Sequence, residues 1–221
     1  MRPSDNIDIS YILTELCNHL MLNGSMVFFS GLLYGKLGIS LFFFHYSRYT
    51  GNPLYHEYAL HLVELVKSQI HEDYPLDYER GLAGVGAGFD YLKKHEYFNV
   101  GDDLMNEIDV KIIKAVGYDR RVDMLTGFGR YLMSRHENTL NTTIKDALIQ
   151  IKSYLPNSID APNENNKKDK IFEIINSFNL SDLDELFSNN HDFAFQGGYT
   201  GLGLALISTI DADSNSWTNL L

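Results

Sequence analysis

Polar and charged side chains that could bind a ligand or carry out catalysis stand at the starts of four glycine-led segments. They are Tyr34, Asp77, Glu79, Arg80, Asp123 and Gln196, with His191 and Asp192 shortly before Gln196. If the four segments are helices whose first turns meet at one end of a bundle, these side chains surround a common opening. Paired carboxylates in such an opening could act as general acid and general base, as they do in glycoside hydrolases.

The same residues also have a purely structural interpretation. Acidic side chains are favoured at helix N-termini, where they offset the positive end of the helix dipole. They can also form ion pairs with nearby cations, and Arg80, Arg120 and Arg121 are close to them in the sequence. Both interpretations stay open at this point. We expect the first six residues to form a binding site, and we assign no catalytic residue.

The four segments are copies of one pattern: a glycine, two residues, a second glycine, an apolar residue, then glycine or serine. The copies lie at 35–40, 81–86 and 198–203, and a degenerate copy at 124–129 has Met124 in place of the first glycine. An apolar run of helix length follows each copy. Glycine weakens a helix, so its repeated use indicates either a close approach of backbone or amide groups left open to a ligand.

Apolar helices alternate with amphipathic helices along the chain. We expect buried helices at 35–49, 80–95, 124–135 and 199–210, and amphipathic helices at 7–22, 53–71, 102–116 and 140–155. No segment alternates with a period of two residues for long enough to predict a strand. The repeat therefore predicts an all-α fold, an α/α toroid or barrel-like array of helical hairpins with four glycine-led inner helices.

We expect residues 1–221 to form a single domain. Proline, asparagine, serine and aspartate between 156 and 166 predict a mobile loop, and two inserted helices are expected at about 167–189. Four hairpins leave either a narrow bundle or an open arc with exposed apolar ends. The expected covers are helix 7–22, the segment after Ile210 and the inserted helices, and the alternative is a second chain in a homodimer.

Charge and cysteine content exclude several classes of function. The formal net charge is -11, which argues against nucleic acid and anionic membranes as partners. No long uncharged apolar run and no signal-peptide pattern is present, so we expect a cytoplasmic protein. The single cysteine, Cys17, excludes an internal disulfide and a zinc site with two thiolates from this chain. We expect Cys17 to be buried.

Segments such as 80–92 and 198–206 resemble the glycine-led inner-helix repeats of the lanthionine synthetase C-like family. The resemblance extends from about Gly31 to Ile210. It implies an α/α toroid that handles ribosomally made peptides. It also implies a site at the inner-helix N-termini, where the cyclases of that family bind zinc through two cysteines and a histidine to activate a substrate cysteine.

This sequence departs from the family pattern at the positions that would hold zinc. Tyr34, Arg80, Asp123 and Gly197 stand where cysteine or histidine would open a repeat. We therefore expect no cofactor, and a zinc-free accessory factor whose partner is a peptide or a peptide-modifying protein. The alternative is an active enzyme, either a zinc-dependent cyclase with unusual ligands or a carboxylate-based hydrolase.

Overall fold

The computed structural model describes residues 8–138, 141–155, 165–178, 180, 186–187 and 193–221 of the chain. Within these ranges all regular secondary structure is helical, which confirms the all-α class. None of the described helices is both long enough and apolar enough to cross a bilayer. The loop expected at 156–166 falls mostly outside the described residues, and so does the second inserted helix.

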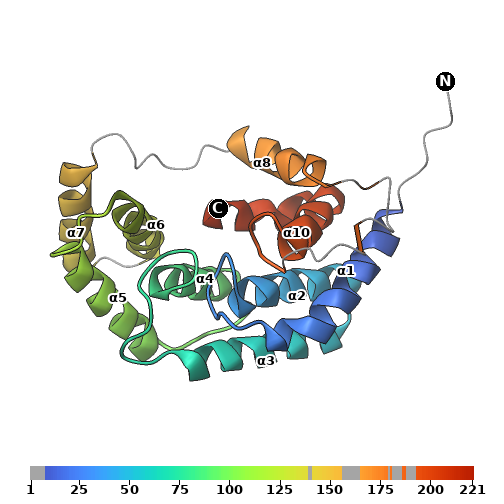
Figure 1. Cartoon of the computed structure of the whole chain (residues 1–221), viewed down its shortest axis with the longest axis horizontal. Coiled ribbons are helices and arrows are strands. Elements are labelled where there is room, and N and C mark those ends of the chain that lie inside the picture. The colour runs from blue at the N-terminus through green and yellow to red at the C-terminus, as the bar shows by residue number, and fades with distance from the viewer. Residues whose placement is uncertain (1–7, 139–140, 156–164, 179, 181–185, 188–192) are drawn as a thin grey trace.

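The inner layer consists of α2 (Lys36–Thr50), α4 (Leu82–Lys94), α6 (Val122–Asn138) and α10 (Tyr199–Ile210). They contact one another in the order α10, α2, α4, α6 and form an open arc (Figure 1). Every residue at 36–46, 82–92 and 199–208 is buried. Helix α6 differs, because it exposes one face that includes Asp123 and Arg130. The predicted inner set is confirmed.

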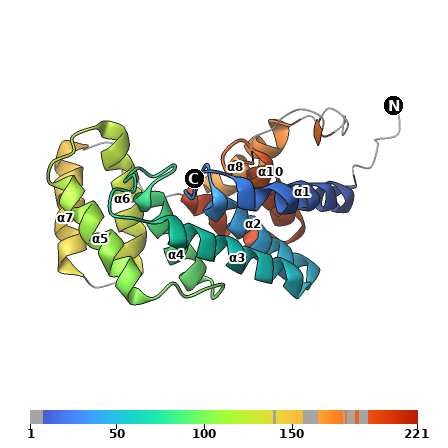
Figure 2. The same ribbon diagram turned by 60° about the horizontal axis from the view of Figure 1, so that its bottom comes forward.

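The outer layer consists of α1 (Ile9–Asn23), α3 (Pro53–Gln69), α5 (Asp102–Val116) and α7 (Thr142–Tyr154). Helix α1 packs on α10, α3 on α2, α5 on α4 and α6, and α7 on α5 and α6 (Figure 2). Each has one buried stripe, as an amphipathic helix should; in α3 it is Ala59, Leu62, Val63 and Val66. The expected alternation of inner and outer helices is therefore correct.

Helix ends follow from local capping. Gly51 ends α2 in the left-handed conformation (φ 68°), Asn52 accepts a hydrogen bond from the Leu54 N–H, and Pro53 opens α3. Helix α1 begins later than the expected residue 7. Its cap is Asp8, whose carboxylate accepts the N–H groups of Ser10 and Tyr11, and the caps expected at Ser4 or Asp5 lie outside the described residues.

Helix α10 is covered on several sides. Helix α1, helix α8 (Asn165–Asn176) and the C-terminal 3₁₀ segment η2 (Ala212–Leu220) all pack on it. Segment η2 lies between the two ends of the arc (Figure 1), with the Trp217 side chain fully buried and its indole N–H donating to Ser208 Oγ. Helix 7–22, the segment after Ile210 and the first inserted helix thus cover this end of the array, although the first two were expected to cover both ends. The homodimer stays a prediction.

The second glycine of three copies lies directly against backbone. A Cβ atom on Gly38, Gly84 or Gly201 would overlap the carbonyl oxygen six residues earlier, which belongs to Leu32, Tyr78 or Phe195 respectively. The loop before each of these three helices folds back across its first turn, and only a residue without a side chain leaves room for it. Of the two explanations for the glycines, close backbone approach is the one that the structure supports.

The folded-back loops also use the free amides of the helix N-termini. The Lys36 N–H donates to Phe29 O (3.0 Å), and the Leu82 N–H donates to Pro75 O (2.7 Å). These donors have no partner within their own helices, so the loops satisfy them. They are therefore not open to a ligand.

Candidate functional site

The loops before α10, α2 and α4 join at one end of the arc. The Phe195 N–H donates to Leu33 O (2.8 Å), and the Leu33 N–H donates to Glu79 O (3.0 Å). The fourth inner helix, α6, has the degenerate copy and no such loop. It meets the others through Gly127, where an added Cβ would lie 2.7 Å from Tyr78 Cβ. Three loops thus form a continuous rim that α6 completes.

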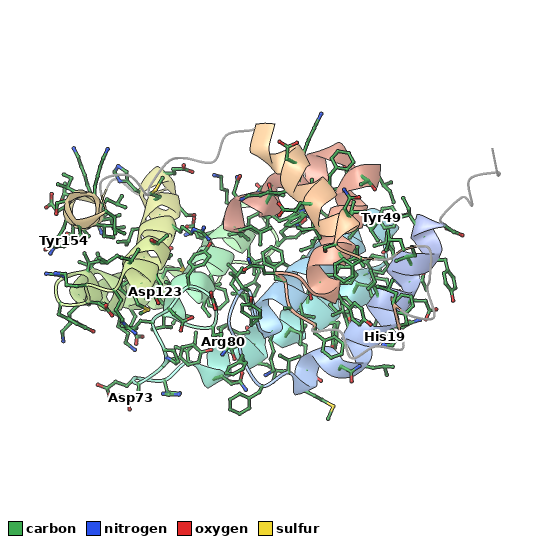
Figure 3. All side chains as sticks on the ribbon, turned by 45° about the horizontal axis from the view of Figure 1, so that its top comes forward. His19, Tyr49, Asp73, Arg80, Asp123 and Tyr154 are labelled. Carbon is green, nitrogen blue, oxygen red and sulfur yellow. The ribbon has the colours of Figure 1, made fainter. Side chains whose placement is uncertain are left out.

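A cleft of about 840 Å³ lies inside this rim. Five of the six residues expected to form a site line it: Asp77, Glu79, Arg80, Asp123 and Gln196. The sixth, Tyr34, lies beside the cleft with its ring centroid 5.4 Å from the Arg80 guanidinium. Arg80 comes from the loop before α4 and Asp123 from the first turn of α6 (Figure 3). Residues 191 and 192 lie outside the described residues.

Arg80 is fixed through its backbone, while its side chain is exposed. Its N–H donates to Asp77 Oδ1 (2.7 Å), and its carbonyl oxygen accepts from the Tyr74 hydroxyl (3.3 Å). Its guanidinium lies over the Phe29 ring (4.8 Å) and the Tyr34 ring. Among the described residues it makes no ion pair. Asp77 thus contacts Arg80 through a backbone hydrogen bond and not as an ion pair.

The neighbouring arginines are held by groups other than Asp123. Arg121 pairs with Asp119 (2.7 Å), and this contact, with smaller contributions from the Asp123 and Asp77 charges, raises the pKa of Arg121. Arg120 donates to the carbonyl oxygens of α5's last turn and stacks on Tyr154. Asp123 contacts no cation at ion-pair distance in the described part of the chain. Its carboxylate faces the cleft.

Other residues that line the cleft were not predicted from the sequence, among them Tyr78, Thr126, Arg130 and Leu221. A signal for two of them was present. Asp123, Thr126 and Arg130 are three and four residues apart, so they share one face of α6, and this polar face distinguishes α6 from the other inner helices. Nothing in the sequence indicated that Leu221, far along the chain, would return to this end.

Leu221 forms part of the cleft wall, and side chains of the neighbouring loop and of α6 hold it and Leu220 in place. The Tyr78 hydroxyl donates to the Leu220 carbonyl oxygen (3.0 Å), and Arg130 Nη1 donates to the backbone oxygen of Leu221 (2.7 Å). Tyr78 is buried, and burial raises its pKa, so its hydroxyl stays protonated and remains a donor. The two side chains, from the loop before α4 and from α6, therefore recognise main-chain oxygen atoms.

A buried histidine ties α2 and α4 to η2. His45 Nε2 hydrogen-bonds the Tyr91 hydroxyl (2.8 Å), which in turn contacts Ser216 Oγ (2.9 Å). His45 Nδ1 has no hydrogen-bond partner among the described residues. Burial, and secondarily the charges of Arg48 and His95, lower the pKa of His45 to about 3, with Asp211 acting in the opposite direction. His45 is therefore a packing residue.

The protein should lose stability in acid through His45. Between its ordinary pKa of 6.5 and about 3, the unfolded chain binds a proton that the folded chain does not. Stability therefore falls as pH falls through this window, by about 2 kcal/mol between pH 7.5 and 5. Urea unfolding at both pH values measures the loss, and His45→Gln should lose less than the wild type by that amount. Equal losses would show that the folded state accommodates the proton.

The residues at the cleft do not fit the zinc ion that the resemblance implies. Cys17 lies in α1 and is buried, and burial raises the pKa of its thiol to about 11 against a smaller lowering by Tyr55. A thiol so difficult to ionise is a poor zinc ligand. Within the described residues, no group of three histidine, cysteine, aspartate or glutamate side chains is placed to hold a metal.

Purified protein should accordingly contain far less than one zinc ion per chain. A structural or catalytic zinc site needs three or four ionised or neutral ligands converging in a tetrahedron, and the described part of the cleft does not bring such a set together. Elemental analysis after purification without chelators measures the content. About one zinc per chain that persists on dialysis would contradict this expectation.

Comparison with known proteins identifies the family. No curated protein and no solved structure matches the chain. The family model described as lanthionine synthetase C-like protein matches residues 30–181. The match runs from the loop before α2 to beyond α8, and so includes three of the four inner helices and the loop that carries Asp77, Glu79 and Arg80. The chain belongs to the lanthionine synthetase C-like family.

Proposed function

We propose that this protein is a zinc-free, peptide-binding accessory factor in the modification of a ribosomally made peptide, acting in the cytoplasm. The observation that carries the proposal is the pair of hydrogen bonds by which Tyr78 and Arg130 hold the backbone oxygens of Leu220 and Leu221. Arg130 has further N–H groups besides the one that Leu221 uses, so it can also donate to a main-chain oxygen of a peptide in the cleft. Family membership supports peptides as the ligand class.

The rest of the cleft suits a ligand with both polar and charged groups. Its walls carry acidic side chains from the loop and from α6 and three arginines, which are Arg80, Arg121 and Arg130. Because the rim is joined by backbone hydrogen bonds, little ordering should be needed when a ligand binds. A cleft without zinc can recognise a peptide, but it cannot activate a substrate cysteine through the metal.

The double variant Arg80→Ala and Asp123→Ala should bind peptides about tenfold more weakly than the wild type, since both side chains line the cleft. Its free energy of unfolding should change by less than about 1 kcal/mol, because both residues are exposed. An array of immobilised short peptides, probed with labelled protein, measures the binding, and urea unfolding measures the stability.

A matched control removes one charge of each sign elsewhere. Glu107 and the partly exposed Lys111 form an ion pair on α5 (3.1 Å), away from the cleft, and their double alanine variant should bind the array as the wild type does. The opposite result is a double variant of Arg80 and Asp123 that binds peptides normally and loses much of its stability. That result would show that these two residues stabilise the fold and do not bind the peptide. Hydrolysis of an aryl glycoside that Asp123→Asn abolishes would instead favour the carboxylate-based hydrolase.

A further inference from the structure

Large apolar side chains are exposed on the turn that follows α1. Met26 and Phe28 are 81% and 83% exposed, and Phe29 is 40% exposed. The rings of Phe28 and Phe29 meet edge to face, with their centroids 5.2 Å apart. We call Met26, Phe28 and Phe29 the aromatic turn. Adjacent exposed apolar side chains of this size are uncommon on a soluble protein surface unless they contact a partner.

The backbone of the aromatic turn is held rigidly. Lys36 is buried, and its ammonium group donates to the carbonyl oxygen of Val27 and to Gln69 Oε1 (3.2 Å). The Lys36 N–H donates to Phe29 O (3.0 Å). Burying a lysine costs free energy, and the partners described here for the ammonium are uncharged oxygens. The outcome is a turn whose exposed rings project from a fixed backbone, which lowers the entropy cost of binding.

The aromatic turn is continuous with the cleft through Arg80. The Arg80 guanidinium lies over the Phe29 ring, and Arg80 also lines the cleft. Ring faces on Phe29 and Tyr34 hold the guanidinium in place, while its N–H groups make no ion pair with a described residue. A planar guanidinium in this state is suited to a carboxylate, which it can bind through two parallel hydrogen bonds.

We propose that the aromatic turn and Arg80 form a docking surface for a peptide segment in which a carboxylate lies between apolar side chains. The apolar side chains pack on Phe28 and Phe29, the carboxylate binds Arg80, and the peptide continues into the cleft. This inference rests on the proposed function and specifies the kind of segment that the site recognises. Charge complementarity selects a carboxylate over an amine, because the cation next to the rings is Arg80.

A defined probe tests the proposal. The probe is a fluorescein-labelled peptide with Phe-Glu-Leu in a glycine and serine frame, and its fluorescence anisotropy is followed on titration with protein. We expect Phe28→Ser to weaken binding about tenfold. Because Phe28 is 83% exposed, this variant should fold normally. The matched control is Phe172→Ser on α8, where another phenylalanine is 59% exposed, and its affinity should be unchanged.

The role of the carboxylate is tested by changing both partners. A second probe has Phe-Gln-Leu in the same frame and should bind the wild type about tenfold more weakly than the first. Arg80→Gln should bind the two probes equally, because the charge that distinguishes them has lost its partner. If Arg80→Gln still binds the glutamate probe about tenfold more tightly than the glutamine probe, Arg80 is not the carboxylate site and the proposal is wrong.

The remaining outcomes separate this proposal from the proposed function. Equal affinities of Phe28→Ser and Phe172→Ser would overturn the docking surface. Absence of binding of the glutamate probe to the wild type would overturn it as well. In either case, array binding that depends on Arg80 and Asp123 would leave the peptide-binding function intact. Loss of both kinds of binding would contradict the function and the docking surface together.

Discussion

Replacing Gly84 with alanine should destabilise the protein by about 3 kcal/mol, in spite of the higher helix propensity of alanine. The added methyl group would overlap the carbonyl oxygen of Tyr78, and a backbone oxygen cannot rotate away as a side chain can. The loop would have to move off the first turn of α4. This loop carries Asp77, Glu79 and Arg80, so peptide binding should weaken along with stability.

Gly51→Ala is the matched control for this prediction. Gly51 also has a special role, since it ends α2 with φ 68°, but an added Cβ there would meet no atom within 4 Å. Alanine at Gly51 should therefore cost only the strain of the left-handed conformation, about 1 kcal/mol, and leave peptide binding unchanged. Urea unfolding of both variants measures the difference. Equal losses of stability in the two variants would mean that the loop moves off the first turn of α4 at little cost in free energy.

The inner helices could be predicted from sequence because their signal is repeated. Each copy combines glycines with an apolar run, and the buried residues of α2, α4 and α10 begin at the expected places. The positions of Asp77, Glu79, Arg80, Asp123 and Gln196 in one cleft followed from their equivalent places in the repeat. The periodic pattern therefore predicted the architecture and part of the candidate site.

What could not be predicted depends on contacts between segments far apart in the sequence. The sequence does not show that the loops before α2, α4 and α10 fold back over the helices. In the structure, a Cβ atom added to Gly38, Gly84 or Gly201 would overlap a backbone oxygen of the loop. The return of Leu221 to Arg130, 91 residues away, has no local signal. The partners of the charged residues could not be predicted for a similar reason: Asp77 accepts a backbone N–H, and Arg121 pairs with Asp119.

The arrangement of α4, α5 and α6 depends on a buried charge network. Arg135 of α6 binds Asp109 of α5 (2.7 Å) and Asp90 of α4 (3.3 Å), and all three side chains are nearly inaccessible to solvent. The Tyr131 hydroxyl also donates to Asp109, and Ser134 Oγ donates to Asp90 (2.6 Å). One guanidinium thus joins three helices, and the cleft wall formed by α6 depends on its position.

Arg135→Met should cost about 3–5 kcal/mol of stability, because it removes the cation that two buried carboxylates share. Lys94→Met is the matched control. Lys94 and Glu137 pair across the same two helices, α4 and α6, but at the surface (3.5 Å), and such pairs contribute about 0–1 kcal/mol. Urea unfolding measures both variants, and circular dichroism should show that each keeps its helices.

The double variant Arg135→Met and Asp109→Asn distinguishes the loss of a cation from the loss of packing. Neutralising the carboxylate that Arg135 holds most closely reduces the buried negative charge, while the new amide oxygen at position 109 can still accept from Tyr131. The double variant should therefore be more stable than Arg135→Met alone by about 1–2 kcal/mol, although it carries one more substitution. If it is less stable, Arg135 acts mainly through the packing of its side chain.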